Sequence, residues 1–321
     1  PYCNEYGGYV LNATIARYAY TQIETSNDTT ISVVSVDQNI KLVEKVSSHF
    51  ALDGVLDLHK AVYNYMVLHC NNNQPLHIRL ITYCESPIGS GLGSSSTIVV
   101  SIIKAFSELL NLSLSDYEIA SLAFQIERID CGFQGGRQDQ YAAVFGGINF
   151  MEFYDNDRTI INTLRIKKMI ISELEASLML FYTGISRESS KIIHEQSKNV
   201  EDGVSSTIDA MHNIKKEAVI MKDAFLTGDF DTIKKTLREG WKNKKQSSKS
   251  VTNEYINEIH KVAMSAGSEA IKISGAGGGG FMLLYVPTER RMDVISSLNK
   301  FGGQISNCNL TDQGAYAWTM K

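Results

Sequence analysis

No apolar run in the sequence approaches the length of about 18 residues that a membrane-spanning helix requires. Basic residues do not exceed acidic ones, since 31 Lys and Arg stand against 35 Asp and Glu, a formal net charge of -4. We therefore expect neither a membrane protein nor a general nucleic-acid surface. No internal repeat is evident, which excludes repeat architectures.

Cysteine is scarce, and its 5 copies lack the spacing of metal ligands. An odd number of scattered thiols fits a reducing compartment better than a disulfide framework. No secretory signal peptide is recognisable, so we expect a cytoplasmic protein. The chain begins at Pro1, and the segment from Tyr2 to Ile15 already reads as the middle of a domain. We therefore expect that an N-terminal segment is missing.

The order of patterns along the 321 residues predicts an α+β protein of two domains. Strand-like runs fill residues 9–36 and predict an antiparallel set at the start. Residues 187–237 are largely helical, with interruptions at Gly203 and Gly228, and a strand follows at 281–286. We place the boundary so that residues 1–166 form the N-terminal domain and residues 167–321 the C-terminal domain.

The most informative segment is PIGSGLGSSST, which runs from Pro87 to Thr97. Its glycines stand at every second position and free the backbone for conformations closed to other residues. A predicted strand precedes it, and apolar residues at helical spacing follow it. Unpaired N–H groups and the positive end of a helix dipole converge at such a junction, which predicts a phosphate site. The candidate phosphate-binding residues are Gly89, Ser90, Gly91, Leu92, Gly93, Ser94, Ser95 and Ser96.

The glycine segment matches neither of the best-known phosphate loops. A Walker-type loop needs Lys and then Ser or Thr after its last glycine, but serines follow Gly93. A dinucleotide fingerprint needs G-x-G-x-x-G, whereas this spacing is G-x-G-x-G. A tight turn that leads into a buried helix is the alternative without a ligand.

Two carboxylates farther along the chain are candidates for chemistry. Residues 116–129 are expected to form one helix, and Glu127 would lie at the border of its apolar face, four residues after Ala123. Asp139 stands in GGRQDQYAAVFGG, at the start of another short helix. The alternatives without a catalytic role are an exposed helix carboxylate for Glu127 and a helix N-cap for Asp139.

Together with the glycine loop, the two carboxylates predict phosphoryl transfer. A loop serine and Glu127 would hold Mg²⁺, a hard ion that takes oxygen ligands and keeps substrate phosphates in its shell. Asp139 would orient or deprotonate an acceptor hydroxyl, since this reaction needs little beyond positioning and charge neutralisation. The 7 histidines lack metal-ligand spacing and are not needed for this chemistry.

These residues resemble the superfamily of galactokinase, homoserine kinase, mevalonate kinase and phosphomevalonate kinase. PIGSGLGSSSTI is similar to the second motif of that superfamily, and SGAGGGGFMLLYV is similar to the third, which supports the phosphate loop. The segment IERIDCGFQGGRQDQ has the spacing between metal ligand and catalytic acid found in galactokinases. The resemblance implies ATP and Mg²⁺ as cofactors, Ser95 and Glu127 as magnesium ligands and Asp139 as the catalytic carboxylate.

Within the superfamily, the motifs resemble the kinases of D-glycero-D-manno-heptose 7-phosphate. This resemblance implies phosphorylation of the anomeric hydroxyl to the 1,7-bisphosphate, on a route to nucleotide-activated heptose for surface polysaccharide. It also implies an N-terminal domain with a left-handed β-α-β crossover and a ferredoxin-like C-terminal domain. The family's first motif, a basic strand followed by a glycine-rich turn, should precede Pro1 and is absent.

The acceptor phosphate needs cationic or N–H donors, and Arg is preferred because it binds phosphate with two hydrogen bonds. Surface salt bridges would explain the same cations without a substrate.

A homo-oligomer is possible but no motif encodes it. The expected partners are a small sugar phosphate and ATP, with no nucleic acid and no membrane. The candidates for acceptor contacts are Arg137, Gln138, Arg187, Lys191, Gly275 and Gly277.

Two other functions stay open from the sequence. One is a kinase of the same superfamily that acts on a hexose, another sugar phosphate or an isoprenoid precursor. The other is a sensor of sugars or nucleotides that keeps the phosphate loop and has no activity.

Overall fold

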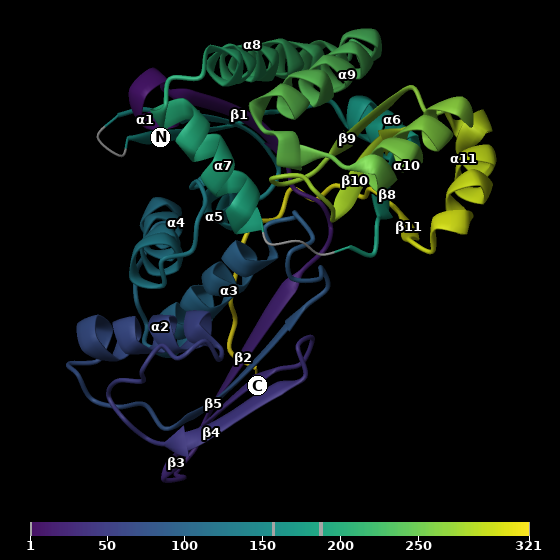
Figure 1. The fold of residues 1–321 in the computed structure, drawn as a ribbon. Coiled ribbons are helices and arrows are strands. Elements are labelled where there is room, and N and C mark those ends of the chain that lie inside the picture. Colours follow the sequence, from purple (N-terminus) through teal and green to yellow (C-terminus); the bar gives the residue numbers. More distant parts are fainter. Residues whose placement is uncertain (1, 156–157, 186–188, 321) are drawn as a thin grey trace. The chain divides into compact units, whose positions relative to one another are not determined.

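A computed structural model describes residues 2–155, 158–185 and 189–320 (Figure 1). The chain forms two compact units that interleave along the sequence. Unit 1 comprises Pro1–Ala16, Gly89–Leu92 and Gly147–Asp312, and unit 2 comprises Arg17–Ile88, Gly93–Gly146 and Gln313–Lys321. The domain boundary expected near residue 166 stays a prediction, because each unit draws on several separate stretches of chain.

The α-helices are α1 (Tyr2–Tyr6), α2 (Asp57–Tyr65), α3 (Ser94–Leu109), α4 (Asp116–Phe124), α5 (Gln138–Phe145), α6 (Lys168–Ser177), α7 (Ser189–Glu201), α8 (Ser205–Thr227), α9 (Phe230–Ser247), α10 (Glu254–Ser265) and α11 (Arg291–Leu298). Short π-helical turns are η1 (Met66–Cys70) and η2 (Gln125–Asp130), and 3₁₀ turns are η3 (Lys249–Val251), η4 (Thr288–Arg290) and η5 (Asn299–Phe301). The strands are β1 (Gly8–Ala13), β2 (Ala19–Thr25), β3 (Thr30–Ser35), β4 (Ile40–Lys45), β5 (Ile78–Cys84), β6 (Ile148–Phe153), β7 (Thr159–Thr163), β8 (Leu178–Tyr182), β9 (Ala270–Ile273), β10 (Phe281–Tyr285) and β11 (Gln304–Asn307).

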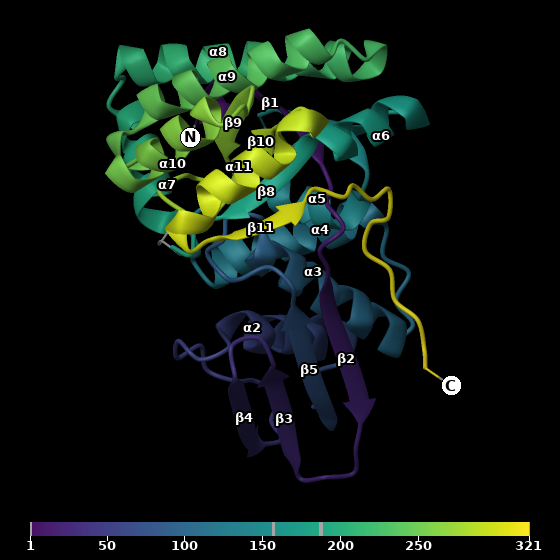
Figure 2. The ribbon, with the colours of Figure 1, turned by 90° about the vertical axis from the view of Figure 1, so that its right-hand side faces the viewer.

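Unit 2 contains a sheet in the order β2-β5-β3-β4, which Figure 2 shows face on. Strand β5 pairs antiparallel with β2 and parallel with β3. Alternate residues of β5 are buried, from Ile78 to Cys84, because successive side chains of a strand point to opposite faces. Helices α2 and α3 pack against each other, and α3 also packs against the sheet.

The antiparallel set predicted for residues 9–36 is wrong. Strand β1 pairs with β6 in a different sheet, and β5 separates β2 from β3. Local alternation correctly indicates strands in this region. It carries no information about partners from distant parts of the chain, such as β5, whose Arg79 pairs with Ser32 of β3.

Unit 1 contains a second four-stranded sheet in the order β11-β8-β10-β9, and every pair in it is antiparallel. Numbered along the chain, these strands have the spatial order 4-1-3-2. Helices connect the first strand to the second and the third to the fourth, which is the ferredoxin-like arrangement. The ferredoxin-like fold predicted for the C-terminal part of the chain is therefore confirmed. The handedness of the crossover in the N-terminal part stays a prediction.

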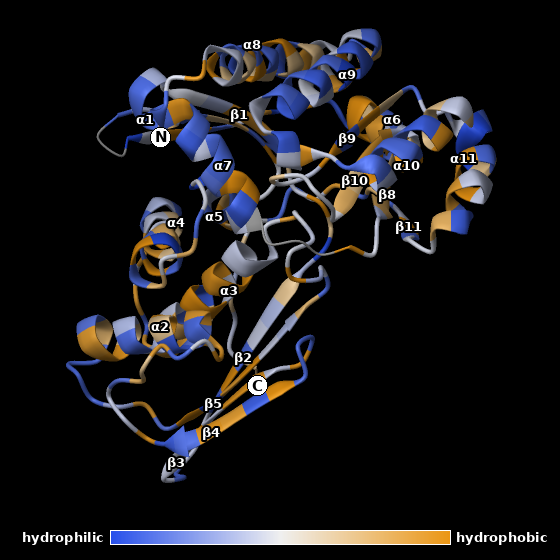
Figure 3. Cartoon of the chain, in the orientation of Figure 1, coloured by the Kyte–Doolittle hydropathy of each residue, from blue (hydrophilic) through white to orange (hydrophobic). Residues whose placement is uncertain are grey.

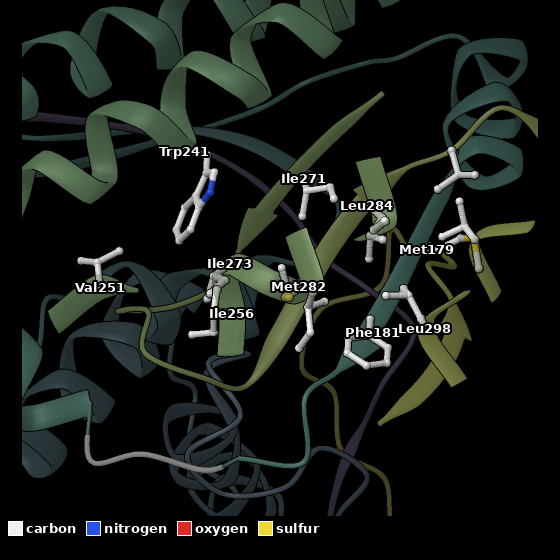
Figure 4. Packing of buried hydrophobic residues seen from close by; sticks show 14 of the residues in the cluster. Met179, Phe181, Trp241, Val251, Ile256, Ile271, Ile273, Met282, Leu284 and Leu298 are labelled. Carbon is white, nitrogen blue, oxygen red and sulfur yellow. The ribbon is translucent and has the colours of Figure 1, made fainter. Parts of the chain in front are cut away.

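The core on one side of this sheet joins strands to helices α9 and α10 (Figure 4). Trp241 from α9 and Ile256 from α10 lie near Ile273 of β9, and Phe181 of β8 lies near Leu298 of α11. All of these side chains are nearly or fully buried. A separate cluster on α8, α9, β8 and β10 includes Phe225 and Phe281. Because α9 contributes to both clusters, its position relative to β9 is fixed by apolar packing.

The helices of the described chain are amphipathic rather than uniformly apolar. Figure 3 shows hydrophobic and hydrophilic residues intermixed along α8 and α9. Among the described residues, no helix is both long enough and apolar enough to cross a bilayer. The interruptions expected at Gly203 and Gly228 are confirmed, because each glycine stands just past a helix end in the left-handed conformation.

Ser115 and Glu118 form a capping box at the start of α4. The Ser115 hydroxyl accepts from the Glu118 N–H, and the Glu118 carboxylate accepts from the Ser115 N–H at 2.7 Å. Two backbone donors at the helix start are thereby satisfied.

We expect Ser115→Ala to lower the stability of unit 2 by about 1 kcal/mol, because the Glu118 N–H loses its acceptor. The matched control is Ser113→Ala, an exposed residue two positions earlier in the same loop. Urea unfolding followed by fluorescence and circular dichroism measures both variants. Equal midpoints for the two variants would show that the cap contributes nothing.

Candidate active site

Helix α3 begins directly after the glycine loop, and three serines occupy its first turn. Gly93 precedes it with a φ of 73°, a left-handed conformation that favours glycine. The Ser94 hydroxyl donates to the Pro87 carbonyl at 3.2 Å, which closes the loop behind the helix start. The hydroxyls of Ser95 and Ser96 both point to one acceptor, the carboxylate of Glu127.

The Glu127 carboxylate is completely buried and receives hydrogen bonds on both oxygens. Oε1 accepts from the Ser95 hydroxyl at 2.7 Å, and Oε2 accepts from the Ser96 hydroxyl at 2.7 Å and the Gln140 amide at 2.6 Å. The Arg128 guanidinium lies 3.3 Å from Oε1. These contacts use the roughly four acceptor positions of a carboxylate, which compensates for its burial.

The single helix predicted for residues 116–129 is wrong in its second half. Helix α4 ends at Phe124, and Glu127 lies in the π-helical turn η2. The wider turn is visible in the bond from the Cys131 N–H to the Ile126 carbonyl, five residues back. The alternative of an exposed carboxylate is wrong, since Glu127 is 0% exposed. Single π turns of this kind are frequent at functional sites.

Arg128 is a site residue that the sequence analysis missed. Its side chain is 11% exposed, and its guanidinium donates to the carbonyls of Gln134 at 3.1 Å and Gly136 at 3.3 Å. A Cβ on Gly135 would lie 2.6 Å from the guanidinium carbon, so the glycine lets the loop pass directly over the Arg128 side chain. The signal that could have indicated it is an Arg directly after a candidate metal ligand and shortly before the glycine pair Gly135 and Gly136.

Asp139 lies on the second position of α5, close to the glycine that starts α3. The N-cap of α5 is Arg137 and no side chain caps it, so the alternative of Asp139 as an N-cap is wrong. A Cβ on Gly93 would lie 3.2 Å from the Asp139 Cγ. Burial raises the pKa of Asp139, opposed by the hydrogen bond from Gln138 and by the charge of Arg128. The structure thus brings Gly93, Glu127 and Asp139 together in unit 2.

The residues around Glu127 fit a magnesium ion by their chemistry. Hydroxyl and carboxylate oxygens are the ligands that Mg²⁺ takes in phosphate-transfer sites, where waters and substrate phosphates complete its shell. The Ser95 hydroxyl donates a hydrogen bond to Glu127, so the lone pairs of its Oγ stay open to a cation. Ligation by Glu127 itself would replace one of its present donors, of which Arg128 at 3.3 Å is the most distant. No cluster of three or more His, Cys, Asp or Glu residues that could hold a metal occurs in the described ranges.

The first part of the glycine loop, residues 89–92, packs in unit 1 against residues 274–280. A Cβ on Gly275 would lie 2.6 Å from the Gly91 Cα, and a Cβ on Gly91 would lie 2.9 Å from the Ser274 carbonyl oxygen. The Phe281 N–H donates to the Ser90 carbonyl at 2.9 Å. The two backbones approach so closely that only glycine fits at the contact.

The hydroxyl oxygen of Ser90 is buried next to this contact. The residue is 0% exposed, and its Oγ has no hydrogen-bond partner in the part of the chain that the structure describes. A buried hydroxyl without a partner costs free energy unless a ligand or water satisfies it. The observation therefore agrees with the phosphate site predicted for this loop.

The candidates for acceptor contacts divide between the two units. In unit 2, the Arg137 guanidinium lies 4.7 Å from the Phe124 ring centre, and the Gln138 amide donates to Asp139 at 3.3 Å. In unit 1, Lys191 lies on α7, Gly275 packs on Gly91, and Gly277 packs on the Val251 backbone. Arg187 lies outside the described residues.

Comparison with known proteins gives a consistent result. The model of the GHMP kinases N terminal domain matches residues 57–147, and that of the GHMP kinases C terminal matches residues 221–304. The D-glycero-alpha-D-manno-heptose 7-phosphate kinase of Campylobacter jejuni is 44% identical over 317 residues, which cover 99% of this chain and 93% of that protein.

Solved structures agree with the sequence matches. A D-glycero-D-manno-heptose 1-phosphate kinase from Bacteroides thetaiotaomicron is 39% identical with a TM-score of 0.84, and the match covers 100% of this chain and 93% of that one. Galactokinase of Lactococcus lactis, solved with galactose, is 16% identical with a TM-score of 0.71, and the match covers 97% and 91% of the two chains. At that identity the likeness to galactokinase concerns the fold alone.

We expect Gly275→Ala to weaken nucleotide binding strongly, because its Cβ would push Gly91 out of place. Gly302→Ala is the matched control: both glycines have a positive φ, 63° and 68°, but a Cβ on Gly302 meets no atom within 4 Å. Backbone strain should cost both variants roughly 1–2 kcal/mol of stability. Only Gly275→Ala should raise the Kd for ADP, measured by calorimetry. Equal Kd values would contradict a role of this contact in the phosphate site.

Proposed function

The chain belongs to the GHMP kinase family, and on this premise we propose that it transfers the γ-phosphate of ATP to the anomeric hydroxyl of a heptose 7-phosphate. The product would be the 1,7-bisphosphate. The relative with 44% identity is named for this acceptor and matches 99% of the chain. The solved structure with 39% identity is named for heptose 1-phosphate, so the position of the acceptor's own phosphate is the point to test.

The glycine loop would bind the phosphates of ATP. Its N–H groups and the start of α3 form an anion site, because the first N–H groups of a helix lack partners and carry the positive end of the dipole. The buried hydroxyl of Ser90 is available as a further donor. The glycine contact between Gly91 and Gly275 holds the loop in a fixed conformation.

Asp139 would act on the acceptor hydroxyl. Its carboxylate would accept the proton of the anomeric O–H while that oxygen forms a bond to the γ-phosphorus. The bond from the γ-phosphorus to the β–γ bridging oxygen breaks, and ADP leaves with the electron pair. The observation that carries this proposal is the approach of Asp139 to Gly93, which brings the candidate base next to the N-cap of α3, at the end of the phosphate loop.

Ser95 and Glu127 would hold Mg²⁺, which, when bound, neutralises phosphate charge during transfer. The chain's own contribution is to fix these oxygens in place. Ser96 and Gln140 hold Oε2 of Glu127, while Oε1 faces Ser95 and the more distant Arg128, so Oε1 is the oxygen that would turn to the ion. We further propose that the enzyme is cytoplasmic. Its product, a heptose bisphosphate, would be used to make nucleotide-activated heptose for surface polysaccharide.

An acceptor panel tests the substrate class. With ATP and Mg²⁺, we expect D-glycero-D-manno-heptose 7-phosphate to give a much higher kcat/KM than heptose 1-phosphate, free heptose, galactose or mevalonate. ADP release measures the rate, and ³¹P NMR locates the new phosphate. A preference for a non-phosphorylated sugar would overturn the assignment. Binding of ATP and heptose 7-phosphate without turnover would favour a sensor instead.

We expect Asp139→Asn to lower kcat by on the order of 10²-fold or more, because the amide cannot accept the proton. Burial raises the pKa of Asp139, so the wild-type rate should fall toward acidic pH at a point above the ordinary range of aspartate. This acidic fall should vanish in the variant. Unchanged turnover in Asp139→Asn would remove Asp139 from the mechanism, and the Kd for ATP serves as the folding control.

A further inference from the structure

Lys244 directs its ammonium group at the backbone of the second glycine segment. The residue lies in the last turn of α9, beside a second lysine, Lys245. Its Nζ donates to the carbonyl of Ile273, at 3.2 Å, and to the carbonyl of Gly275. These two carbonyls flank the point where β9 ends and the glycine segment begins.

The position of Gly275 in turn determines where the phosphate loop can lie. A Cβ on Gly275 would lie 2.6 Å from Gly91, so the two backbones are in direct contact. Residues 274–280 contain four glycines in the left-handed region, at positions 275, 277, 278 and 280. Such a segment has little intrinsic preference for one conformation and depends on outside contacts to select it. The Lys244 ammonium is an outside contact of this kind, and charged donors form the stronger hydrogen bonds.

The surroundings of Lys244 disfavour its charge. Lys272 on β9 is a neighbouring ammonium, and the carboxylate of Glu217 on α8 acts on the charge of Lys272 and accepts from the Asn243 amide at 2.6 Å. Burial, and then the charge of Lys272, lower the pKa of Lys244 to about 7. An apolar side chain of similar length would avoid this cost. The cost of burying this charge is explained if the carbonyls of Ile273 and Gly275 need a donor to hold the glycine segment in place.

We infer that Lys244 is a positioning residue that fixes the glycine segment 274–280 and, through Gly275 and Gly91, the phosphate loop. It acts on ATP through the backbone and need not touch it. This role rests on one part of the proposed kinase function, namely that the loop binds ATP.

The test compares Lys244→Met, which keeps the length and loses the donor, with Lys244→Arg, which keeps a donor. Lys242→Met is the matched control, because Lys242 is exposed on the same helix and pairs only weakly with Glu239, at 3.7 Å. Calorimetry gives the Kd for ATP without any acceptor, and steady-state kinetics give KM for each substrate. ATP binding is measurable even if the acceptor assignment fails, so the two proposals can fail separately.

We expect Lys244→Met to weaken ATP binding about tenfold, equivalent to about 1.4 kcal/mol, with an unchanged KM for the acceptor. Its thermal midpoint should be equal to that of the wild type or higher. Lys244→Arg should restore part of the affinity, and Lys242→Met should match the wild type. An unchanged Kd for ATP in Lys244→Met would overturn the inference. So would a lowered midpoint with equal losses in every kinetic constant, since that pattern indicates a structural role.

Discussion

The burial of the Glu127 carboxylate is the constraint on which the candidate site in unit 2 depends. An ionised group that is 0% exposed is stable only if its acceptor positions are filled. The donors come from the first turn of α3, from the π turn and from α5. These three segments must therefore adopt their observed positions together. Asp139 follows from the same constraint, because its neighbour Gln140 is one of the donors.

The contact between the two glycine segments imposes a different kind of constraint on unit 1. It consists of backbone against backbone, so it has no side chain that could adapt if one segment moved. The dense use of glycine gives the loop close approach and many available N–H groups at the expense of conformational entropy. Neighbouring groups have to supply the order that the glycines lack. The ammonium of Lys244 and the backbone hydrogen bond from the Phe281 N–H to the Ser90 carbonyl do so here.

Much of the site could be predicted from the sequence because its chemistry is carried by short segments. The glycines at positions 89, 91 and 93 indicated a loop, and the residues before and after it indicated a strand and a helix. In the structure a strand precedes Pro87 and a helix starts at Ser94. The ferredoxin-like order was reached through the family resemblance. Sheet partners could not be predicted, because β5 and β6 pair with strands far earlier in the chain. The π turn escaped prediction as well, since the pattern of apolar residues from 116 to 126 is the same for an α-helix.

Arg128 and Lys244 escaped prediction for a shared physical reason. Each donates to backbone carbonyls of a glycine-containing loop, and a carbonyl has no sequence signature. On sequence alone, both look like ordinary surface cations. The structure separates them from such cations by burial: Arg128 is 11% exposed and Lys244 is partly buried, whereas Lys242 has 66% of its side chain exposed. A buried cation that serves a loop carbonyl is thus recognisable only once the loop has been placed.

Glu127 and Lys244 also show two different solutions to the cost of burying a charge. The carboxylate is stabilised by donors on both oxygens, so removal of one donor leaves an acceptor position unfilled while the same oxygen keeps its other donor. Among the described residues the ammonium donates to two carbonyls, and burial, then the charge of Lys272, lower its pKa, so its charged form is disfavoured. A network of the first kind stabilises the fold and the site at once. A contact of the second kind lowers stability and is retained only if the position of the loop matters more to the protein than the free energy that it costs.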